Sequence, residues 1–508
     1  MTRRFLILSD DIRAMGIHLV ANRGTGKSRL LGRFLIPQDI YRGVPTIVID
    51  PIGETINNVI SKLCELPAAI QGQIWKRVIY IDMAGRGGSV CPFPLYYQLG
   101  NESLYQISQR PLDVIRKADA YLATAPVHGW NPTYLIGTHA GRVLFACGCQ
   151  ISELEYLLAY PWLWESRFAE AEQKYPEVKR STDFFRRFSK WSSDRRQSRT
   201  EALLIKAATF TLDPETLAMF SASTPSIDIG TIIEKGQTVL LDFSGVTDLE
   251  RRRFMLMWVV SYIMSYLKAR GPGFTHKPLS LGIDEFSLLT NFQSTAESTF
   301  EQELDELINV YSRSHRLWLT ISSQSIGQFS EKIQAALLSL GTQIFGAISD
   351  MESAEKIAKW FGEIDPWAVK TVRVVAAGRH SVVTTPIYLP LIEQTFLEAK
   401  RLQSLPKFTF LVRPAIAEGT VAKELFCGTI EHFDAGRYVD LALVNKAKAL
   451  LSKRSGVPVE TILAGIAERT PSVPPLPPQS SVAVLKPYEK SRRYLLPKHD
   501  EDTDEDLR

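Results

Sequence analysis

The sequence predicts an α/β fold in which helices cover a mostly parallel sheet and an all-α insertion interrupts the sheet. Three observations support this prediction. Short β-branched runs alternate with helical segments in residues 1–100 and again in residues 236–415. Between residues 101 and 235 such runs are missing, and the apolar residues follow a helical period. A glycine-rich loop follows the first predicted strand and precedes a predicted helix.

The composition is that of a folded protein. The chain has 508 residues, of which 45% are hydrophobic and 22% charged, and both figures argue against wholesale disorder. Its net charge of +4 neither requires nor excludes a nucleic-acid partner. The five cysteines are odd in number and form no C-x-x-C pair, which argues against a disulfide framework or a zinc site. We expect reduced thiols in a cytoplasm.

The first 100 residues contain three predicted strands. Ile17–Ala21 leads into the glycine-rich loop, and a helix is expected from Ser28 to about Leu35. Val44–Asp50 is a continuous β-branched run, which is typical of a strand buried on both faces, and it stops at Pro51. Val78–Asp82 has the same character. This succession predicts parallel strands joined by helices.

The predicted insertion, 101–235, carries many aromatic residues and a run of basic ones. The basic residues are Lys179, Arg180, Arg186, Arg187, Lys190, Arg195, Arg196 and Arg199. Such a run is most often a solvated helix face. Because aromatic residues interleave with it, a surface that faces nucleic acid is the alternative.

Further strands are predicted after the insertion. They are Thr238–Phe243, Leu279–Asp284, Leu317–Ser322, Gln343–Ile348, Val382–Leu389 and Phe408–Val412. The longest apolar stretch, Phe254–Leu267, spans about 14 residues and is too short to cross a membrane, so we expect a buried helix and no transmembrane segment.

The predicted organisation has five parts. Residues 1–100 and 236–415 form the two halves of the core, 101–235 the insertion, 416–470 a helical segment, and 471–508 a proline-rich linker with an acidic, disordered tail.

The loop has the pattern A-x-x-x-x-G-K-S, in which glycines let backbone N–H groups surround a β-phosphate. The following helix adds the positive end of its dipole. Lys27 is expected to neutralise the β- and γ-phosphates, and the Ser28 hydroxyl to bind Mg²⁺. The predicted nucleotide-binding residues are Ala21, Asn22, Arg23, Gly24, Thr25, Gly26, Lys27 and Ser28.

This loop requires an acidic partner at the end of a neighbouring strand. Asp284 and Glu285 follow an apolar strand, so Asp284 is the predicted Mg²⁺ ligand and Glu285 the general base. Asp50 and Asp82 also end apolar strands, but neither has an adjacent Glu. Gln324 ends the next strand, where it either orients water beside the γ-phosphate or caps a turn.

Arg313 and Arg316 precede that strand, at the end opposite Gln324. They are either arginine fingers that act on a neighbouring subunit or surface charges, and Arg313 is taken as the catalytic candidate. His315 between them is expected to be a helix-terminal surface residue.

In their order these motifs resemble the HerA/FtsK superfamily, and most of all its TraG-type conjugative coupling and type IV secretion ATPases. The motifs are A-x4-G-K-S, the D-P-I-G-E of residues 50–54, G-I-D-E-F at 282–286, S-R-S-H-R at 312–316, the strand ending at Gln324, and D-M-E-S-A-E-K-I-A at 350–358. The family pattern has Lys where Ile52 stands here. The resemblance covers about residues 15–415, and the insertion matches the family's all-α domain only in outline.

The resemblance implies a RecA-like core and a ring, usually a hexamer, that uses ATP and Mg²⁺ to move DNA. It also implies active sites between subunits, and secretion or relaxosome-type proteins as further partners. The loop begins at residue 21, so we expect a soluble, cytoplasmic member that is either free or recruited to the inner face of the membrane. Two alternatives stay open: an ATPase that powers protein secretion or assembly without DNA, and a nucleotide-gated scaffold. The polar segment 290–298 is a candidate pore loop.

Overall fold

The computed structural model describes residues 9–122, 130–273, 275–290, 299–361, 365–376, 382–415, 426–429 and 439–470. The chain divides into two units, Met1–Arg469 and Thr470–Arg508, and the architecture below is that of the first. The proline-rich linker, the acidic tail and residues 291–298 of the candidate pore loop lie outside the described residues.

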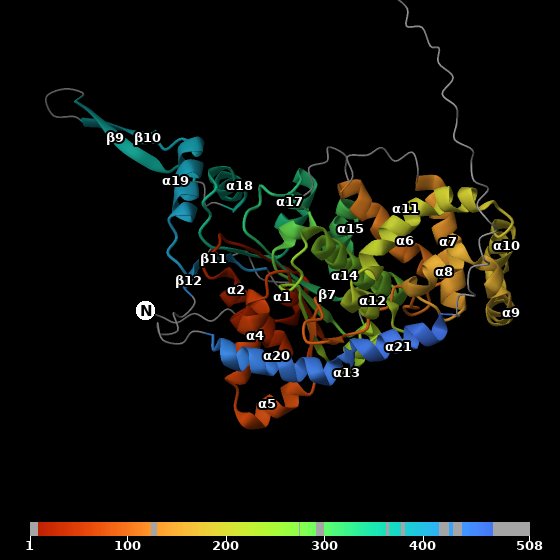
Figure 1. Ribbon diagram of the computed structural model, residues 1–508. Coiled ribbons are helices and arrows are strands. Elements are labelled where there is room, and N and C mark those ends of the chain that lie inside the picture. Colours follow the sequence, from red (N-terminus) through yellow and green to blue (C-terminus); the bar gives the residue numbers. More distant parts are fainter. Residues whose placement is uncertain are drawn as a thin grey trace, which may run out of the picture. The chain divides into compact units, whose positions relative to one another are not determined.

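A nine-stranded sheet forms the centre of this unit (Figure 1), with the strand order β12-β11-β8-β1-β7-β6-β2-β5-β3. All neighbours from β8 to β3 are parallel, and β11 and β12 add an antiparallel edge. The predicted α/β fold with a mostly parallel sheet is therefore confirmed. The strands are β1 Ile17–Val20, β2 Thr46–Asp50, β3 Val78–Asp82, β5 Thr238–Asp242, β6 Leu279–Ile283, β7 Leu317–Ser323, β8 Thr342–Phe345, β11 Thr409–Arg413 and β12 Phe426–Thr429.

Side chains leave the sheet alternately to its two faces, as the pleat requires. In β2, Ile47 and Ile49 join the core that includes the long helix α14 (Leu249–Arg270), while Val48 joins the core on the other face. Because β2 is buried on both faces, its continuous apolar run is accounted for. The predicted buried helix at 254–267 is the middle of α14, and no described helix is long and apolar enough to cross a membrane.

Helices near the first strands frame the glycine-rich loop. The predicted helix at 28–35 begins one residue earlier and runs further, as α2 (Lys27–Leu30), a π-helical turn (Leu31–Leu35) and α3 (Ile36–Tyr41). The remaining helices of this region are α1 Asp10–Ala14, α4 Glu54–Cys64 and α5 Ala68–Trp75.

Between β4 (Ser89–Val90) and β5, the described residues contain helices and no strand. The helices are α6 Leu104–Leu122, α7 Trp130–Ala146, α8 Leu154–Ala159, α9 Glu165–Lys174, α10 Lys179–Phe188, α11 Ser193–Thr211, α12 Pro214–Ser221 and α13 Ile229–Lys235. Three 3₁₀ turns, Ile151–Glu153, Pro161–Trp164 and Pro176–Val178, lie among them. Their apolar residues and those of α14 belong to one core cluster, so the helical segment shares its interior with one face of the sheet.

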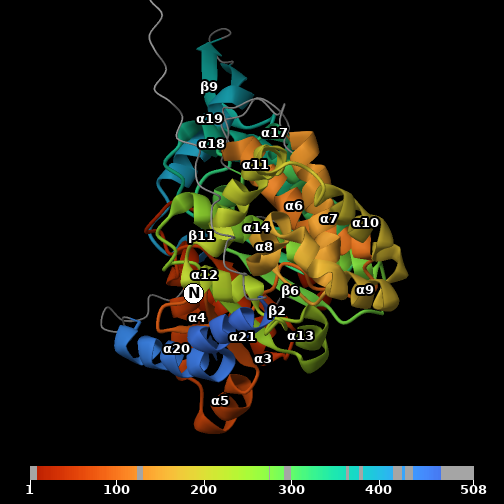
Figure 2. The same ribbon diagram turned by 45° about the vertical axis from the view of Figure 1, so that its right-hand side comes forward.

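The C-terminal part of the unit adds an antiparallel ribbon of β9 (Val369–Ala376) and β10 (Val382–Tyr388). Figures 1 and 2 both show it standing away from the nine-stranded sheet. The strand predicted at 382–389 exists, but it pairs with β9, which was not predicted. Residues 369–372 of β9 are exposed, so they show no pattern of burial against a core. The other elements are the 3₁₀ turn Phe286–Leu289, α15 Thr299–Glu306, the π turn Leu307–Tyr311, α16 Ser312–Ser314, α17 Glu331–Leu338, α18 Met351–Phe361, α19 Leu391–Gln403, α20 Leu441–Ser455, β13 Val457–Pro458 and α21 Val459–Arg469.

Candidate nucleotide-binding site

The glycine-rich loop connects the end of β1 with the first residue of α2. Ala21 N donates to Ser323 O at 3.1 Å, and Asn22 N donates to Ala347 O at 2.9 Å, which ties the loop to the ends of β7 and β8. Within the loop, Thr25 Oγ1 donates to Asn22 O at 2.6 Å. The loop is therefore held from both neighbouring strands at the carboxyl edge of the sheet, where ligands of parallel α/β folds bind.

Two glycines adopt left-handed conformations that the loop requires. Gly24 has φ +78° and Gly26 has φ +104°. A Cβ on Gly26 would lie 2.4 Å from Phe408 Cδ1, whereas nothing lies within 4 Å of one on Gly24. Phe408 N donates to Thr25 O at 2.8 Å, so the segment before β11 packs directly on the loop. This contact of Phe408 was not predicted from the sequence.

The strand order brings the predicted acidic residues to the loop. β7 lies between β1 and β6, and all three run parallel, so their carboxyl ends share one edge. Asp284 and Glu285 follow β6, and Gln324 follows β7. Glu285 has φ +49°, a left-handed conformation that costs a non-glycine residue about 1–2 kcal/mol. Such strain concentrates at functional sites.

Lys27 lies at the centre of a buried ion cluster. Its Nζ is 2.7 Å from Asp284 Oδ1 and 2.7 Å from Glu285 Oε1, and it also contacts Ser322 Oγ at 3.3 Å. The exposed fractions of Lys27, Asp284 and Glu285 are 5%, 1% and 6%. Gln324 Nε2 donates to both oxygens of Glu285, at 3.1 Å each. The structure thus brings together the predicted lysine, both carboxylates and the predicted glutamine.

Two further side chains hold Asp284. Ser322 Oγ donates to its Oδ1, and Thr55 Oγ1 donates to its Oδ2 at 2.6 Å. Sequence reasoning missed both hydroxyls. Thr55 directly follows the D-P-I-G-E motif, and Ser322 lies two residues before Gln324. Their positions beside predicted site residues in the sequence were the signal that could have identified them.

The charges of this cluster reinforce one another. Burial disfavours the ammonium of Lys27, but the adjacent charges of Asp284 and Glu285 outweigh it and raise the pKa of Lys27. Burial likewise disfavours the Asp284 carboxylate, but Lys27 and the hydrogen bonds from Lys27, Ser322 and Thr55 lower its pKa. Lys27 and Asp284 are therefore both charged at neutral pH.

The other strand-end aspartates have different surroundings. Asp50 accepts hydrogen bonds from the backbone N–H groups of Ile52, Gly53 and Ile56, at 3.0, 2.7 and 2.8 Å, and so fixes the start of α4. Burial and the charge of Asp284 raise the pKa of Asp50 to about 7. Asp82, on β3 at the far edge of the sheet, pairs with Arg86 at 2.8 Å.

The predicted arginines lie at the other end of β7. Arg313, in α16, is exposed. It precedes β7, whereas Gln324 follows it, so the seven-residue strand places the two residues about 20 Å apart. Arg316 precedes the same strand and has φ +51°. The expectation for His315 was wrong in part: it ends the helix, but it is only 6% exposed, because its ring packs edge-on against Tyr311.

The residues present fit a Mg²⁺ ion that is bound together with a nucleotide. Ser28 Oγ is half-buried and lies 3.4 Å from Glu54 Oε2, while Asp284 offers a buried carboxylate. The described residues contain no group of three or more His, Cys, Asp or Glu that could hold a metal ion alone. Mg²⁺ is usually held by one or two protein groups plus phosphate oxygens and water, so a sparse donor set is what it requires.

A glycine-rich loop at the end of an interior parallel strand, with its lysine facing an acidic pair that follows the next strand but one, defines a RecA-like P-loop NTPase fold. The structure is similar to the bacterial conjugative coupling protein TrwBdeltaN70 in its unbound monoclinic form, with 14% identity, a TM-score of 0.47, and coverage of 83% of this chain and 86% of that chain. It is also similar to VirB4 of Thermoanaerobacter pseudethanolicus, with 14% identity, a TM-score of 0.48, and coverage of 82% and 89%.

No protein-family model matches the sequence, and no curated protein matches it significantly.

Proposed function

We propose that the chain is an ATP-hydrolysing motor that moves DNA as a ring of subunits, in conjugative transfer or type IV secretion. The observation that carries the hydrolytic part is the buried cluster of Lys27, Asp284 and Glu285, with Gln324 bound to Glu285. A chain that only binds nucleotide has no need for the second carboxylate or for the glutamine that orients it.

The side chains of the cluster have distinct tasks in this proposal. Lys27 exchanges its carboxylate partners for the phosphates of ATP, which frees Glu285 to accept a proton from the attacking water. Gln324, held by both oxygens of Glu285, fixes the direction of that carboxylate. Mg²⁺, held by Ser28 and Asp284, would neutralise charge on the phosphates.

Glu285→Gln tests the assignment of the base. We expect the turnover number to fall by about 10²–10⁴-fold, with nucleotide affinity retained, because only proton transfer is removed. Asp82→Asn is the matched control, since Asp82 also ends a parallel strand but lies at the far edge of the sheet. Phosphate release and binding of a fluorescent ATP analogue are the measurements, and unchanged turnover in Glu285→Gln would exclude Glu285 as the base.

A cluster of arginines supports the DNA part of the proposal. The ring of His139 stacks on Phe184 with centroids 4.3 Å apart. Burial and the charges of Arg142, Arg180 and Arg187 lower the pKa of His139 to about 4, so three guanidinium groups lie near this pair. Arg180 and Arg187 are exposed and form no ion pair with a described carboxylate. Cationic side chains around stacked rings suit the phosphates and bases of nucleic acid.

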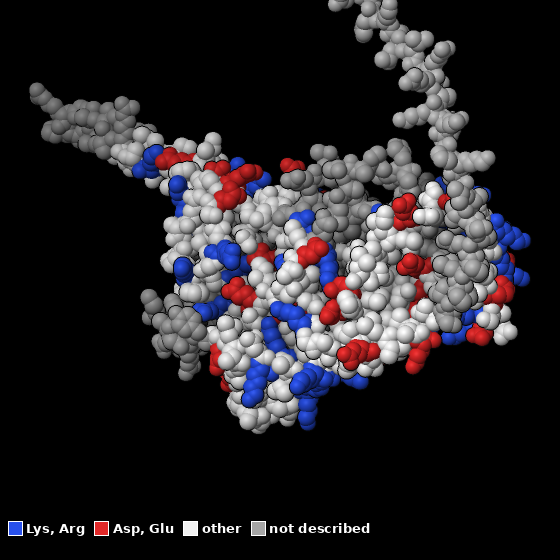
Figure 3. All heavy atoms as spheres, viewed as in Figure 1, with Lys and Arg blue, Asp and Glu red and all other residues white. Residues whose placement is uncertain are grey.

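Two residues of the predicted basic run have partners within the protein. Arg186 pairs with Glu165, Glu172 and Asp183, and Arg196 donates to backbone carbonyls. Lys and Arg gather over α10 at the right of Figure 3, with Asp and Glu beside them. The surface proposed for DNA therefore leaves out Arg186 and Arg196 and includes Arg142 from α7.

The test of this surface is the salt dependence of DNA binding. The double variant R180E/R187E should reduce the slope of log K against log salt by about 1.8 for duplex DNA, because each phosphate contact contributes about 0.9. K446E/K453E reverses two exposed lysines on α20 and should leave the slope unchanged. ATPase activity is measured with and without DNA in parallel. No DNA affinity and no stimulation would exclude DNA as the cargo.

The proposal that the subunits act as a ring rests on Arg313. Because Arg313 is exposed and lies at the opposite end of β7 from Gln324, it is too far from the site of its own subunit, which supports a role at the site of a neighbouring copy. Mixing inactive R313A with inactive K27M subunits should restore part of the ATPase activity. Absence of any restoration, with assembly retained, would exclude this role.

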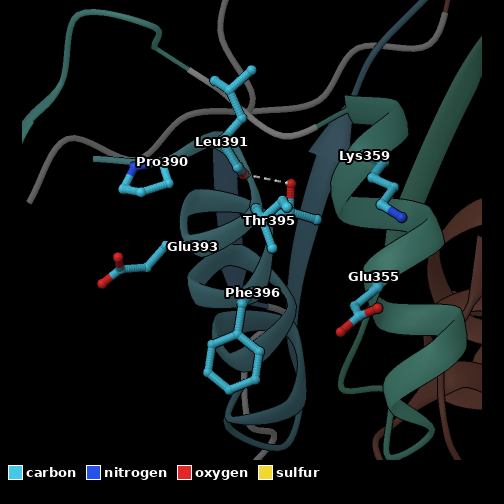
Figure 4. Close-up of a pocket in the computed structure, with 8 residues that line it drawn as sticks. Glu355, Lys359, Pro390, Leu391, Glu393, Thr395 and Phe396 are labelled. Carbon is cyan, nitrogen blue, oxygen red and sulfur yellow. Dashed lines mark hydrogen bonds between the residues drawn. The ribbon is translucent and has the colours of Figure 1, made fainter. Parts of the chain in front are cut away.

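An ATPase that moves protein is the second candidate, and exposed apolar residues near β10 and α19 favour it. Trp367 is 72% exposed and Ile392 85%. A cavity of about 690 Å³ lies between α18 and α19, where Phe396 and Glu355 border it from opposite sides (Figure 4). Binding of a purified secretion subunit that I392D abolishes, together with absent DNA affinity, would favour this candidate.

A further inference from the structure

The first turn of α4 contacts both Asp284 and Ser28, the last residue of the glycine-rich loop. Thr55, the second residue of α4, is fully buried, and its Oγ1 donates to Asp284 Oδ2 at 2.6 Å. Glu54, the first residue, places Oε2 at 3.4 Å from Ser28 Oγ. Two successive residues of one helix therefore reach the two side chains that are the proposed Mg²⁺ ligands.

The two oxygens of Asp284 have different partners. Oδ1 accepts from Lys27 Nζ, Ser322 Oγ and the backbone N–H of Glu285, while Oδ2 accepts from Thr55. When phosphates draw Lys27 away, Oδ1 keeps the hydroxyl of Ser322 and Oδ2 keeps that of Thr55. One hydroxyl on each oxygen is sufficient to fix the plane of the carboxylate.

We propose that Thr55 is a positioning residue of the nucleotide site, which orients Asp284 toward the Mg²⁺ ion. This inference rests on the proposed function, because it assigns a role within the same site. Thr55 acts through Asp284 and does not itself touch the nucleotide. Partners that orient a metal ligand in this way usually contribute 10–100-fold to metal affinity or activity.

The surroundings of Thr55 hold its hydroxyl in place. The three backbone hydrogen bonds to Asp50 fix the turn that leads into α4. On the other side, α4 packs against the helix that follows the loop at Gly32, where an added Cβ would lie 2.5 Å from Thr55 O. Only glycine permits this approach. The distance between the loop helix and Thr55 is therefore set by close packing on both sides.

The proposed role of Thr55 requires its hydroxyl and not its methyl group. Thr55→Val keeps the shape and removes the donor, whereas Thr55→Ser keeps the donor and removes the methyl group. A matched control is Thr46→Val, because Thr46 is also fully buried but donates to Val44 O at 2.8 Å, at the opposite end of β2 from Asp50. The three variants separate the hydrogen bond from packing and from the general effect of this substitution.

The experiment titrates Mg²⁺ against a fluorescent ATP analogue bound to the full chain. In Thr55→Val, the Mg²⁺ concentration at half-maximal binding should rise about 10–100-fold. Binding in EDTA should be unchanged, and Thr55→Ser and Thr46→Val should lie within about threefold of wild type. Circular dichroism confirms that each variant is folded.

Three outcomes would overturn the inference. They are a wild-type Mg²⁺ requirement in Thr55→Val, an equal defect in Thr55→Ser, and a defect in EDTA as large as that with Mg²⁺. A wild-type chain that binds Mg²⁺ with nucleotide but hydrolyses nothing would refute the proposed hydrolysis and leave the role of Thr55 to be decided by the binding data. A wild-type chain that binds no nucleotide would refute both.

Discussion

Lys27 neutralises two buried carboxylates, so its removal should destabilise the folded chain as well as abolish nucleotide binding. Lys27→Met keeps an unbranched side chain of similar length but leaves Asp284 and Glu285 without a cation. Nζ lies 2.7 Å from each carboxylate, and the side chains of all three residues are at most 8% exposed. Removing one partner of a buried ion pair costs about 3–5 kcal/mol, and we expect a loss of that size in the free energy of unfolding without nucleotide.

The origin of this loss can be separated by a second substitution. In K27M/E285Q only the Asp284 carboxylate lacks a cation, and the repulsion between Asp284 and Glu285 is removed. The free energy of unfolding of the double variant should therefore be about 1–3 kcal/mol higher than that of K27M. The control is Lys448→Met, because Lys448 pairs with the buried Asp242 at 2.7 Å in another part of the sheet. Adding E285Q to K448M should not raise its free energy of unfolding.

Urea unfolding in EDTA, followed by tryptophan fluorescence and far-UV circular dichroism, measures these differences. The reasoning is refuted if K27M is as stable as wild type, or if E285Q relieves K448M as much as K27M. The result also matters for activity assays, since the lost ATPase activity of K27M alone would not separate binding from folding.

Two further predictions concern β1 and the glycine-rich loop. Burial lowers the pKa of His18 to about 4, although a hydrogen bond to Gln343 opposes the shift, so the unfolded chain takes up a proton at higher pH than the folded chain. Unfolding free energy should therefore fall by about 3 kcal/mol as the pH drops from 6.5 to 4, at about 1.36 kcal/mol per pKa unit. His18→Asn should lack this part of the pH dependence, and equal slopes in urea titrations would contradict it. Gly26→Ala should weaken nucleotide binding far more than Gly24→Ala. Both glycines have positive φ, so the backbone strain is common to the two variants, but only the Cβ of Gly26→Ala would collide with Phe408. Equal affinities of the two variants, measured with a fluorescent ATP analogue, would refute the steric explanation.

Much of the site could be predicted because its parts are local patterns. The loop at 21–28 is contiguous, and Glu285 and Gln324 each end an apolar run, so their positions at strand ends follow from the chain itself. Parallel strands place their carboxyl ends at one edge, which is why the residues were expected to meet. Their assignment as catalytic groups remains a proposal.

Other parts were not predicted, and each depends on contacts between distant segments. Thr55 is an ordinary helical threonine in the sequence, and only the packing of α4 beside β6 brings it to Asp284. Phe408 reaches Gly26 because β11 joins the sheet edge beside β8. Arg142 lies on α7, about one helical turn from His139. It belongs to the same arginine cluster as Arg180 and Arg187 because α7 packs against α10.

The sequence by itself determined the fold class and the loop, because hydrophobic period and glycine placement act over a few residues. The tertiary structure decided which strands are neighbours, and therefore that Lys27 meets Asp284 and Glu285 with Gln324 beside them. Strand order is set by the burial of whole faces and not by any local pattern. For the same physical reason, only the folded chain shows which buried hydroxyls hold the carboxylates and which arginines remain free of acidic partners among the described residues.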